Sequence, residues 1–95
     1  MVGVLTVFQG DLARVEEGKR LLHDTIIPAL KAHKGFKRGS WLLNTQTAEL
    51  TAISIWEDEA ALKEGLETLQ QVRTQAASMG ITLKSTQTLD VLAIA

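Results

Sequence analysis

The sequence contains no cysteine and no tyrosine, and it has a single proline among its 95 residues. Without cysteine there are no disulfides, no thiolate metal ligands and no cysteine nucleophile, which fits a reducing compartment. We therefore expect a cytoplasmic protein. Without tyrosine, no phenol is available as an acid or as a hydrogen-bond donor, so any polar site must use other side chains.

A surplus of one charge and long apolar runs are also missing. Ten basic and eleven acidic residues leave a net charge of −1, and the two signs alternate along the chain. Nucleic-acid-binding domains usually carry a basic footprint, so we expect no nucleic-acid partner. No uncharged apolar stretch approaches the ~18 residues of a membrane-spanning helix. The start, MVGVLTVFQGD, also lacks the basic region and the cleavage site of a signal peptide. We therefore expect no membrane partner.

What the sequence does contain is an alternation of strand and helix patterns within a single domain, residues 1–95. Runs rich in β-branched and aromatic residues predict four strands, and apolar residues at helical spacing predict two helices. The fold class is therefore α+β, with ferredoxin-like βαββαβ order, one four-stranded antiparallel sheet and both helices on one face. We expect the strands at residues 2–9, 37–44, 49–56 and 83–94, and the helices between Asp11 and Gly35 and between Asp58 and Gly80.

Both predicted helices carry start and stop signals. Asp11 and Asp58 directly precede the apolar periodicity, as N-capping residues do. Gly35 and Gly80 directly follow it, and we expect them to end the helices in the left-handed conformation.

Three residues inside the helical patterns require an explanation. Pro28 lacks a backbone donor, so it should kink the first helix or end a first segment near Ile27. Gly18 and Gly65 each cost roughly 0.5–1 kcal/mol relative to alanine in a helix. Close packing of helix on sheet would explain both glycines, and a backbone gap beside a ligand is the alternative.

The predicted strands carry apolar side chains on both faces of the sheet. If water covered the face without helices, each strand would alternate apolar and polar residues. A monomer would instead expose a large apolar patch, which soluble monomers rarely do. Packing against a second copy would bury it, so we expect a homodimer. The third strand shows the pattern, with Leu50, Ala52, Ser54 and Trp56 on one side and Ile53 and Ile55 on the other.

Two stretches carry a resemblance to a known family. Lys34-Gly35-Phe36 follows the first helix, and the third strand ends in Ile53-Ser54-Ile55-Trp56 before an acidic, alanine-rich helix start at residues 57–62. Together they resemble the antibiotic-biosynthesis-monooxygenase group of the dimeric α+β barrel superfamily. The resemblance implies that two sheets form a barrel across the dimer and that each subunit has a small-molecule pocket between sheet and helices.

The activities of this superfamily are mixed, and the resemblance transfers few functional residues. Haem-degrading members use an asparagine on the first strand, a tryptophan ending the third and a histidine on the second helix. Only Trp56 matches, which argues against haem degradation. Polyketide monooxygenases place an asparagine on the third strand, where this chain has Ala52 and Ser54. We expect no cofactor.

The candidate site residues follow from these considerations. His23 is the candidate catalytic base, because an imidazole titrates near neutral pH. His33, among lysines near the helix end, is expected in solvent, and the ten-residue spacing of the two histidines does not suit a metal pair. Arg73 could clamp an anionic ligand, although an exposed helical arginine is the simpler interpretation. We expect the substrate pocket to be lined by Thr6, Phe8, Trp41, Ser54 and Trp56.

Two functions remain open at this stage. The first is binding of a small hydrophobic or aromatic molecule by a cofactor-independent monooxygenase that acts on an aromatic or quinol-type substrate. The second is a non-catalytic dimeric binding or stress-response module for a hydrophobic metabolite. An open pocket with His23 or Ser54 pointing into it would favour the enzyme.

Overall fold

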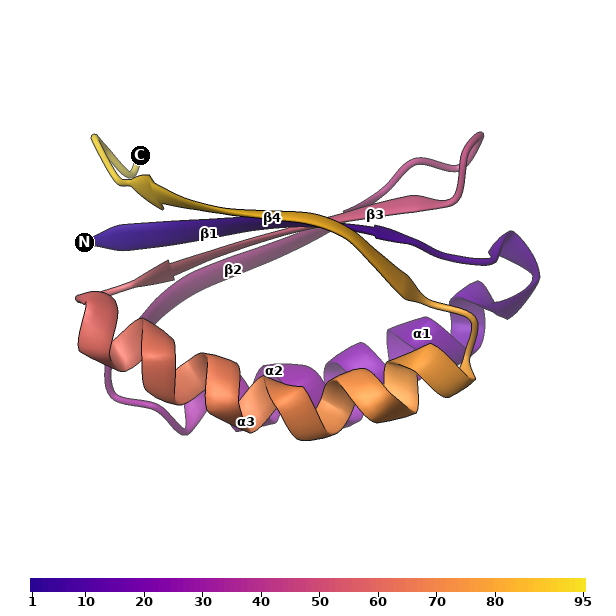
Figure 1. Ribbon diagram of the computed structural model, residues 1–95, viewed down its shortest axis with the longest axis horizontal. Helices are drawn as coiled ribbons and strands as arrows, with labels where there is room; N and C mark the ends of the chain where they lie inside the picture. Colours follow the sequence, from indigo (N-terminus) through magenta and orange to yellow (C-terminus); the bar gives the residue numbers. More distant parts are fainter.

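The computed structural model describes all 95 residues as two layers, a sheet and a pair of helical segments beneath it (Figure 1). The strands are antiparallel and lie in the order β2-β3-β1-β4. This confirms the predicted α+β class and the βαββαβ order. The strands are β1 (Val2–Gln9), β2 (Phe36–Leu43), β3 (Glu49–Trp56) and β4 (Thr82–Asp90). The helical elements are η1 (Leu12–Arg14), α1 (Val15–Leu21), η2 (Leu22–Ile26), α2 (Ile27–Lys31) and α3 (Glu59–Ser78).

The last strand is shorter than the sequence predicts. We expected it to reach Ile94, but β4 ends at Asp90. Asp90 pairs with Val2, the first residue of β1, and a final hydrogen bond joins the Val91 amide to the carbonyl of Met1. Beyond that point β1 offers no further backbone partner, so the predicted end of the strand was wrong.

The first helical stretch changes its winding just before proline. A π-helical turn, η2, ends at Ile26, and α2 begins at Ile27 with Pro28 in its first turn. Ile26 and Ile27 keep right-handed helical dihedrals, so the helical stretch continues through this point, and the change from π to α winding accompanies the missing amide of Pro28. The predicted end of a first segment near Ile27 is thus seen as a change of winding and not as a break in the helix.

Both N-caps are confirmed, whereas only one of the two predicted glycine ends is. Asp11 accepts a hydrogen bond from the Ala13 amide at 3.0 Å, and Asp58 accepts one from the Ala61 amide at 2.8 Å. Gly80 has φ = +79° and ends α3 as predicted. Gly35 does not adopt a positive φ, so its predicted conformation was wrong.

Gly35 has a different structural role, because it allows a close approach to α3. A Cβ at this position would overlap the side chain of Ala61. The Gly35 carbonyl accepts a hydrogen bond from the Glu57 amide at 2.8 Å, just before α3 begins. The turn after α2 is thereby fixed to the start of α3.

The tightly packed core occupies one end of the molecule. It consists of Val2 and Val4 of β1, Leu30 of α2, Trp56 of β3 and Leu62 of α3. Trp56 is 0% exposed and is the largest side chain of this cluster. The other end, beneath the C-terminal half of β1 and between α1 and the last turns of α3, contains no residue of this cluster.

His33 belongs to this packed end. Its Nε2 lies 2.9 Å from the Thr68 hydroxyl, and its ring meets that of Trp56 edge-on with the centroids 6.1 Å apart. The expectation that His33 lies in solvent was therefore wrong.

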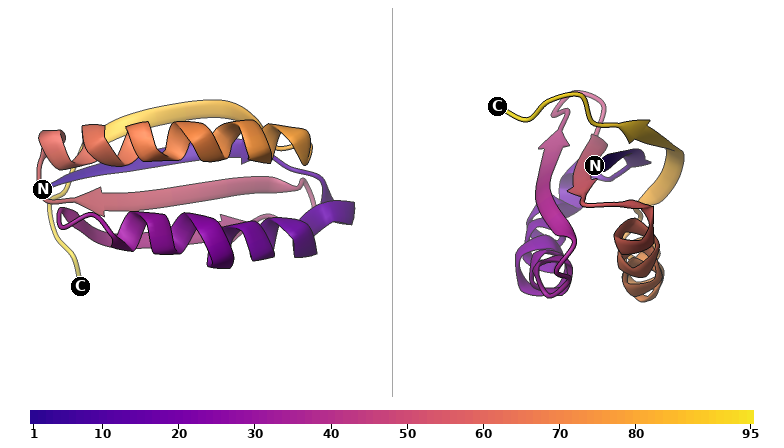
Figure 2. Two further views of the ribbon diagram at one scale, coloured as in Figure 1. Left: turned by 90° about the horizontal axis from the view of Figure 1, so that it is seen from below. Right: turned by 90° about the vertical axis from the view of Figure 1, so that its left-hand side faces the viewer.

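The face of the sheet opposite the helices is uncovered (Figure 2). The strand alternation places Leu5 and Ile53 on this face, because Thr6 and Ala52, their neighbours, share the other face with the buried Trp56. Leu42 is 53% exposed, Leu89 45% and Ile53 37%. The apolar second face predicted from the strand pattern is therefore present.

No helix has the length and apolar character needed to cross a membrane.

Candidate functional site

A cavity of about 280 Å³ lies between the sheet and the helices, next to the packed core, and two core residues, Val4 and Leu30, belong to its lining. Twenty of its 28 lining residues are hydrophobic. The sheet supplies the roof, and α1 and α3 supply the two sides, which run side by side beneath it (Figure 2). The α3 wall consists of Leu66, Leu69, Val72, Arg73, Ala76 and Met79.

Four of the five predicted pocket residues line this cavity: Thr6 and Phe8 of β1, Trp41 of β2 and Ser54 of β3. They meet because β1 and β2 flank β3, so their inward side chains share one face. Trp56 is not in the lining, and its complete burial assigns it to the core.

Trp56 nevertheless orients a polar group of the cavity, the Ser54 hydroxyl. Its indole Nε1 donates a hydrogen bond to the Ser54 hydroxyl oxygen at 3.0 Å. Ser54 makes no other side-chain hydrogen bond, so its own O–H is available to donate to a ligand. The second hydroxyl, that of Thr6, lies 3.3 Å from the Thr86 hydroxyl on β4.

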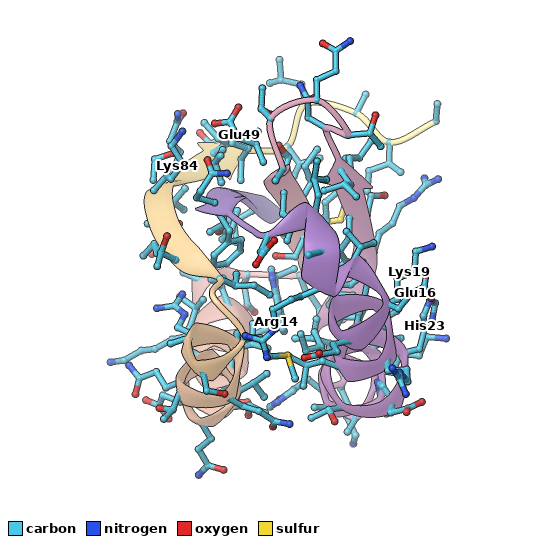
Figure 3. All side chains as sticks on the ribbon, turned by 90° about the vertical axis from the view of Figure 1, so that its right-hand side faces the viewer. Arg14, Glu16, Lys19, His23, Glu49 and Lys84 are labelled. Atoms are coloured by element: carbon cyan, nitrogen blue, oxygen red, sulfur yellow. The ribbon has the colours of Figure 1, made fainter.

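His23 lies outside the cavity. It is exposed within η2 and does not contribute to the lining. Figure 3 shows its imidazole on the outer side of the helix, away from α3. The proposed role of His23 as a base stays a prediction, without a contact to the cavity.

The two helical glycines prove to be different. A Cβ at Gly65 would lie 2.6 Å and 2.7 Å from Cζ3 and Cζ2 of Trp56, so close packing explains this glycine. Gly18 lines the cavity, and a Cβ there would meet no atom within 4 Å. For Gly18 the explanation by close packing was wrong, and the alternative of a backbone gap applies.

Arg14 spans one end of the cavity, a role that sequence reasoning missed. Its guanidinium donates to the Ser78 carbonyl at the end of α3 and to the Glu17 carboxylate, at 3.2 Å and 2.9 Å. Figure 3 shows Arg14 in the gap between the two helices. Only its position just after the capping Asp11 marked it in the sequence.

Charged groups away from the cavity have local roles. The Lys84 ammonium, hydrogen-bonded to the Glu49 carboxylate at 2.6 Å, lowers the pKa of Glu49 below its ordinary value. This pair joins β4 to β3 across the end of β1. No three histidine or acidic side chains gather in a way that could hold a metal ion.

Comparison with known proteins identifies the fold. No family model and no curated protein matches the sequence. Among solved structures, a candidate antibiotic biosynthesis monooxygenase from Deinococcus radiodurans matches with a TM-score of 0.82 at 15% identity, over 100% of this chain and 96% of that one. SnoaB, a cofactor-independent oxygenase from Streptomyces nogalater, matches with a TM-score of 0.71 at 16% identity, over 98% and 94%. The monooxygenase from the gene ActVA-Orf6 of Streptomyces coelicolor, in complex with nanaomycin D, matches with a TM-score of 0.74 at 15% identity, over 99% and 90%. This chain therefore has the fold of the antibiotic-biosynthesis-monooxygenase-like group.

Proposed function

We propose that this protein binds a small, mainly apolar molecule in the cavity between its sheet and its helices. The observation that carries the proposal is the apolar lining of the space that the packed core leaves unfilled between sheet and helices. Ligand sites are typically concave, mostly apolar and furnished with a few polar groups. Thr6 and Ser54 supply such polar groups in the roof.

The size and walls of the cavity favour a flat ligand of a few fused or linked rings. At about 280 Å³ the cavity is larger than the ~150 Å³ engineered cavity that holds benzene. Phe8 and Trp41 offer aromatic surfaces on which a ring can stack. The Ser54 hydroxyl, oriented by Trp56, donates to a ring oxygen of the bound ligand.

The finer proposal is oxygenation of an aromatic or quinol-type ligand without a cofactor. Two proteins of the same fold are named as a cofactor-independent oxygenase and a monooxygenase, and this motivates the proposal. In the balanced reaction, a phenol ring C–H becomes a quinone carbonyl. O2 gives one oxygen atom to the carbonyl, and the other leaves as water with the ring and phenol hydrogens. An apolar cavity suits this chemistry because it excludes water from the reacting carbanion.

A non-catalytic binding module is the second candidate, and the lining favours it in one respect. The lining contains no imidazole and a single carboxylate, that of Asp11, which caps the first helical turn. A base for proton abstraction is therefore not provided by the cavity wall. A substrate that arrives already ionised would not need one.

We further propose that two copies pack through their uncovered sheet faces. Leu42, Ile53 and Leu89 lie exposed on that face, and a second identical face complements them by symmetry. Burying this apolar area removes it from water, which is the main driving force for such association. Most of the cavity lining comes from the helix-covered side of the sheet, but Leu42 and Ile53 belong both to the lining and to the proposed dimer face.

Binding is tested by fluorescence titration with phenylnaphthylamine, a neutral apolar dye. We expect saturable binding to the unchanged protein and a loss of at least about tenfold in affinity for Gly18→Leu, since the new side chain enters the cavity. The matched control is Ala77→Leu, at an exposed position of α3 outside the lining. Equal binding by both variants would reject the cavity as the site.

Oxygenation is tested with a panel of naphthols and anthrones under isotopically labelled O2. We expect one labelled oxygen atom in the quinone product and one in water, at a rate that Gly18→Leu abolishes and Ala77→Leu preserves. Tight ligand binding without O2 consumption would reject the enzyme and leave the binding module.

A further inference from the structure

The cavity wall on α3 contains a cation at a position where the helix otherwise has apolar residues. The inner stripe of this helix advances in steps of three and four residues through Leu62, Leu66 and Leu69. The same spacing continues the stripe through Val72 and Ala76, and Arg73 is the neighbour of Val72 at its edge. Such a stripe normally faces the interior and is apolar. Arg73 therefore places a permanent positive charge beside this apolar stripe, in the lining of the cavity.

Arg73 takes part in none of the ion pairs of the protein. It belongs to the cavity lining while remaining exposed, as a long side chain does when its stem covers apolar surface and its charged end reaches water. No carboxylate oxygen lies within 4.0 Å of it, and no other residue receives a hydrogen bond from it. All five of its N–H donors are therefore available.

The other two cations of the lining already have partners. Arg14 is paired with Glu17 at 2.9 Å, and Lys19 is paired with Glu16 at 3.5 Å. Figure 3 shows the labelled Lys19 and Glu16 next to each other on the first helical stretch. Arg73 is thus the one cation of the cavity wall that a ligand can engage without displacing an acidic side chain.

The facing side of the cavity is open. Gly18 of α1 lines the same cavity and leaves the space at its Cα empty. The carboxylate of Asp11 also lies in the lining, but it is held by the Ala13 amide as a helix cap. The cavity therefore offers a ligand both unfilled space at Gly18 and an unpaired cation at Arg73.

We infer that the cavity takes an amphipathic ligand whose rings lie inside and whose anionic oxygen group, a carboxylate or sulfonate, is bound by Arg73 at the mouth. The guanidinium fork matches two oxygens of such a group. This inference rests on the proposed function, because it specifies the ligand of the same cavity. It also orients the ligand, since the acid at Arg73 directs the opposite edge of the rings toward Thr6 and Ser54.

The test uses two dyes with the same rings. Anilinonaphthalene sulfonate carries an anionic group, and phenylnaphthylamine is its neutral counterpart. Both are titrated by fluorescence against the unchanged protein and against Arg73→Gln, Arg73→Lys and Lys63→Gln. Lys63 lies on α3, is exposed and is outside the lining, so its substitution makes the same charge change on the same helix without touching the cavity.

We expect the sulfonate to bind about tenfold more tightly than the neutral dye, the gain from one charge-assisted hydrogen-bonded pair. Arg73→Gln should remove that advantage and leave the affinity for the neutral dye unchanged. Arg73→Lys should keep part of it, and Lys63→Gln should keep all of it. Raised salt should weaken only the sulfonate.

Two results overturn the inference, and they differ in what else they reject. If both dyes bind equally, or Arg73→Gln and Lys63→Gln weaken the sulfonate equally, the role of Arg73 is rejected and the apolar binding site stands. If neither dye binds, the cavity does not admit ligands, and both the proposed function and this inference fail.

Discussion

Replacing a helical glycine by alanine is expected to have opposite consequences in the two helices. Alanine normally stabilises a helix by roughly 0.5–1 kcal/mol relative to glycine. At Gly18 the new methyl group meets open space, so Gly18→Ala should gain about that amount. The same change at Gly65 drives the methyl group into the ring of Trp56.

The penalty at Gly65 is large because the ring cannot move aside. Trp56 is fully buried and packs edge-on against Phe36, with the centroids 5.2 Å apart, as well as against His33. Overpacking of a core typically costs about 1–3 kcal/mol. After subtraction of the helical gain, Gly65→Ala should lose up to about 2.5 kcal/mol. Because the helical gain is common to both variants, they should differ by the overpacking cost, about 1–3 kcal/mol.

Thermal and denaturant unfolding measure the difference. For a domain of this size about 1 kcal/mol corresponds to 4–8 °C in Tm, so the two variants should melt on opposite sides of the unchanged protein. All samples are compared at one protein concentration, because association contributes to apparent stability. In a Trp56→Phe background the smaller ring should reduce the penalty of Gly65→Ala. Equal melting temperatures for Gly18→Ala and Gly65→Ala would refute the packing argument.

Three further changes test other parts of the structure. Ile53→Lys places a charge on the uncovered face, so the variant should sediment as a monomer where the unchanged protein sediments as a dimer. If the unchanged protein is already a monomer, the proposed dimer is rejected. His23→Ala should leave dye binding unchanged because the imidazole lies outside the lining, and lost turnover with retained binding would restore its predicted role as a base. The lowered pKa of Glu49 means that its pair with Lys84 contributes stability above the ordinary carboxyl pKa of 4.5, and that this contribution is lost as the pH falls through the lowered value. Lys84→Gln should raise the pKa of Glu49 in an NMR titration, and an unchanged titration would show that the pair does not form in solution.

Local signals were sufficient to predict most of the secondary structure. β1 and β3 begin and end where the apolar runs do, because Gly10 and the acidic helix start interrupt them at once. The caps at Asp11 and Asp58 were equally direct, since a capping side chain acts on amides two or three residues away.

Features that depend on distant neighbours could not be predicted in the same way. The end of β4 is set by where β1 begins, which the residues of β4 do not encode. Gly18 and Gly65 have the same sequence signature, and only the ring of Trp56 beside one of them separates their roles. His23 lies in a π-helical turn, whose extra residue per turn changes the face on which a side chain emerges from that expected of an α-helix.

The two ends of this small molecule differ in how tightly they are packed, and therefore in how much they contribute to stability. Trp56 and Leu30 pack the helices against the sheet at one end. The contacts at this end therefore contribute most to the free energy of global unfolding. At the other end the helices enclose a hollow, and local opening there breaks few packed contacts. On the proposed binding function, a ligand would enter by a small separation of α1 from the end of α3, which breaks the Arg14–Ser78 hydrogen bond and leaves the packed end intact. A bound ligand would fill the cavity and so complete the packing between sheet and helices.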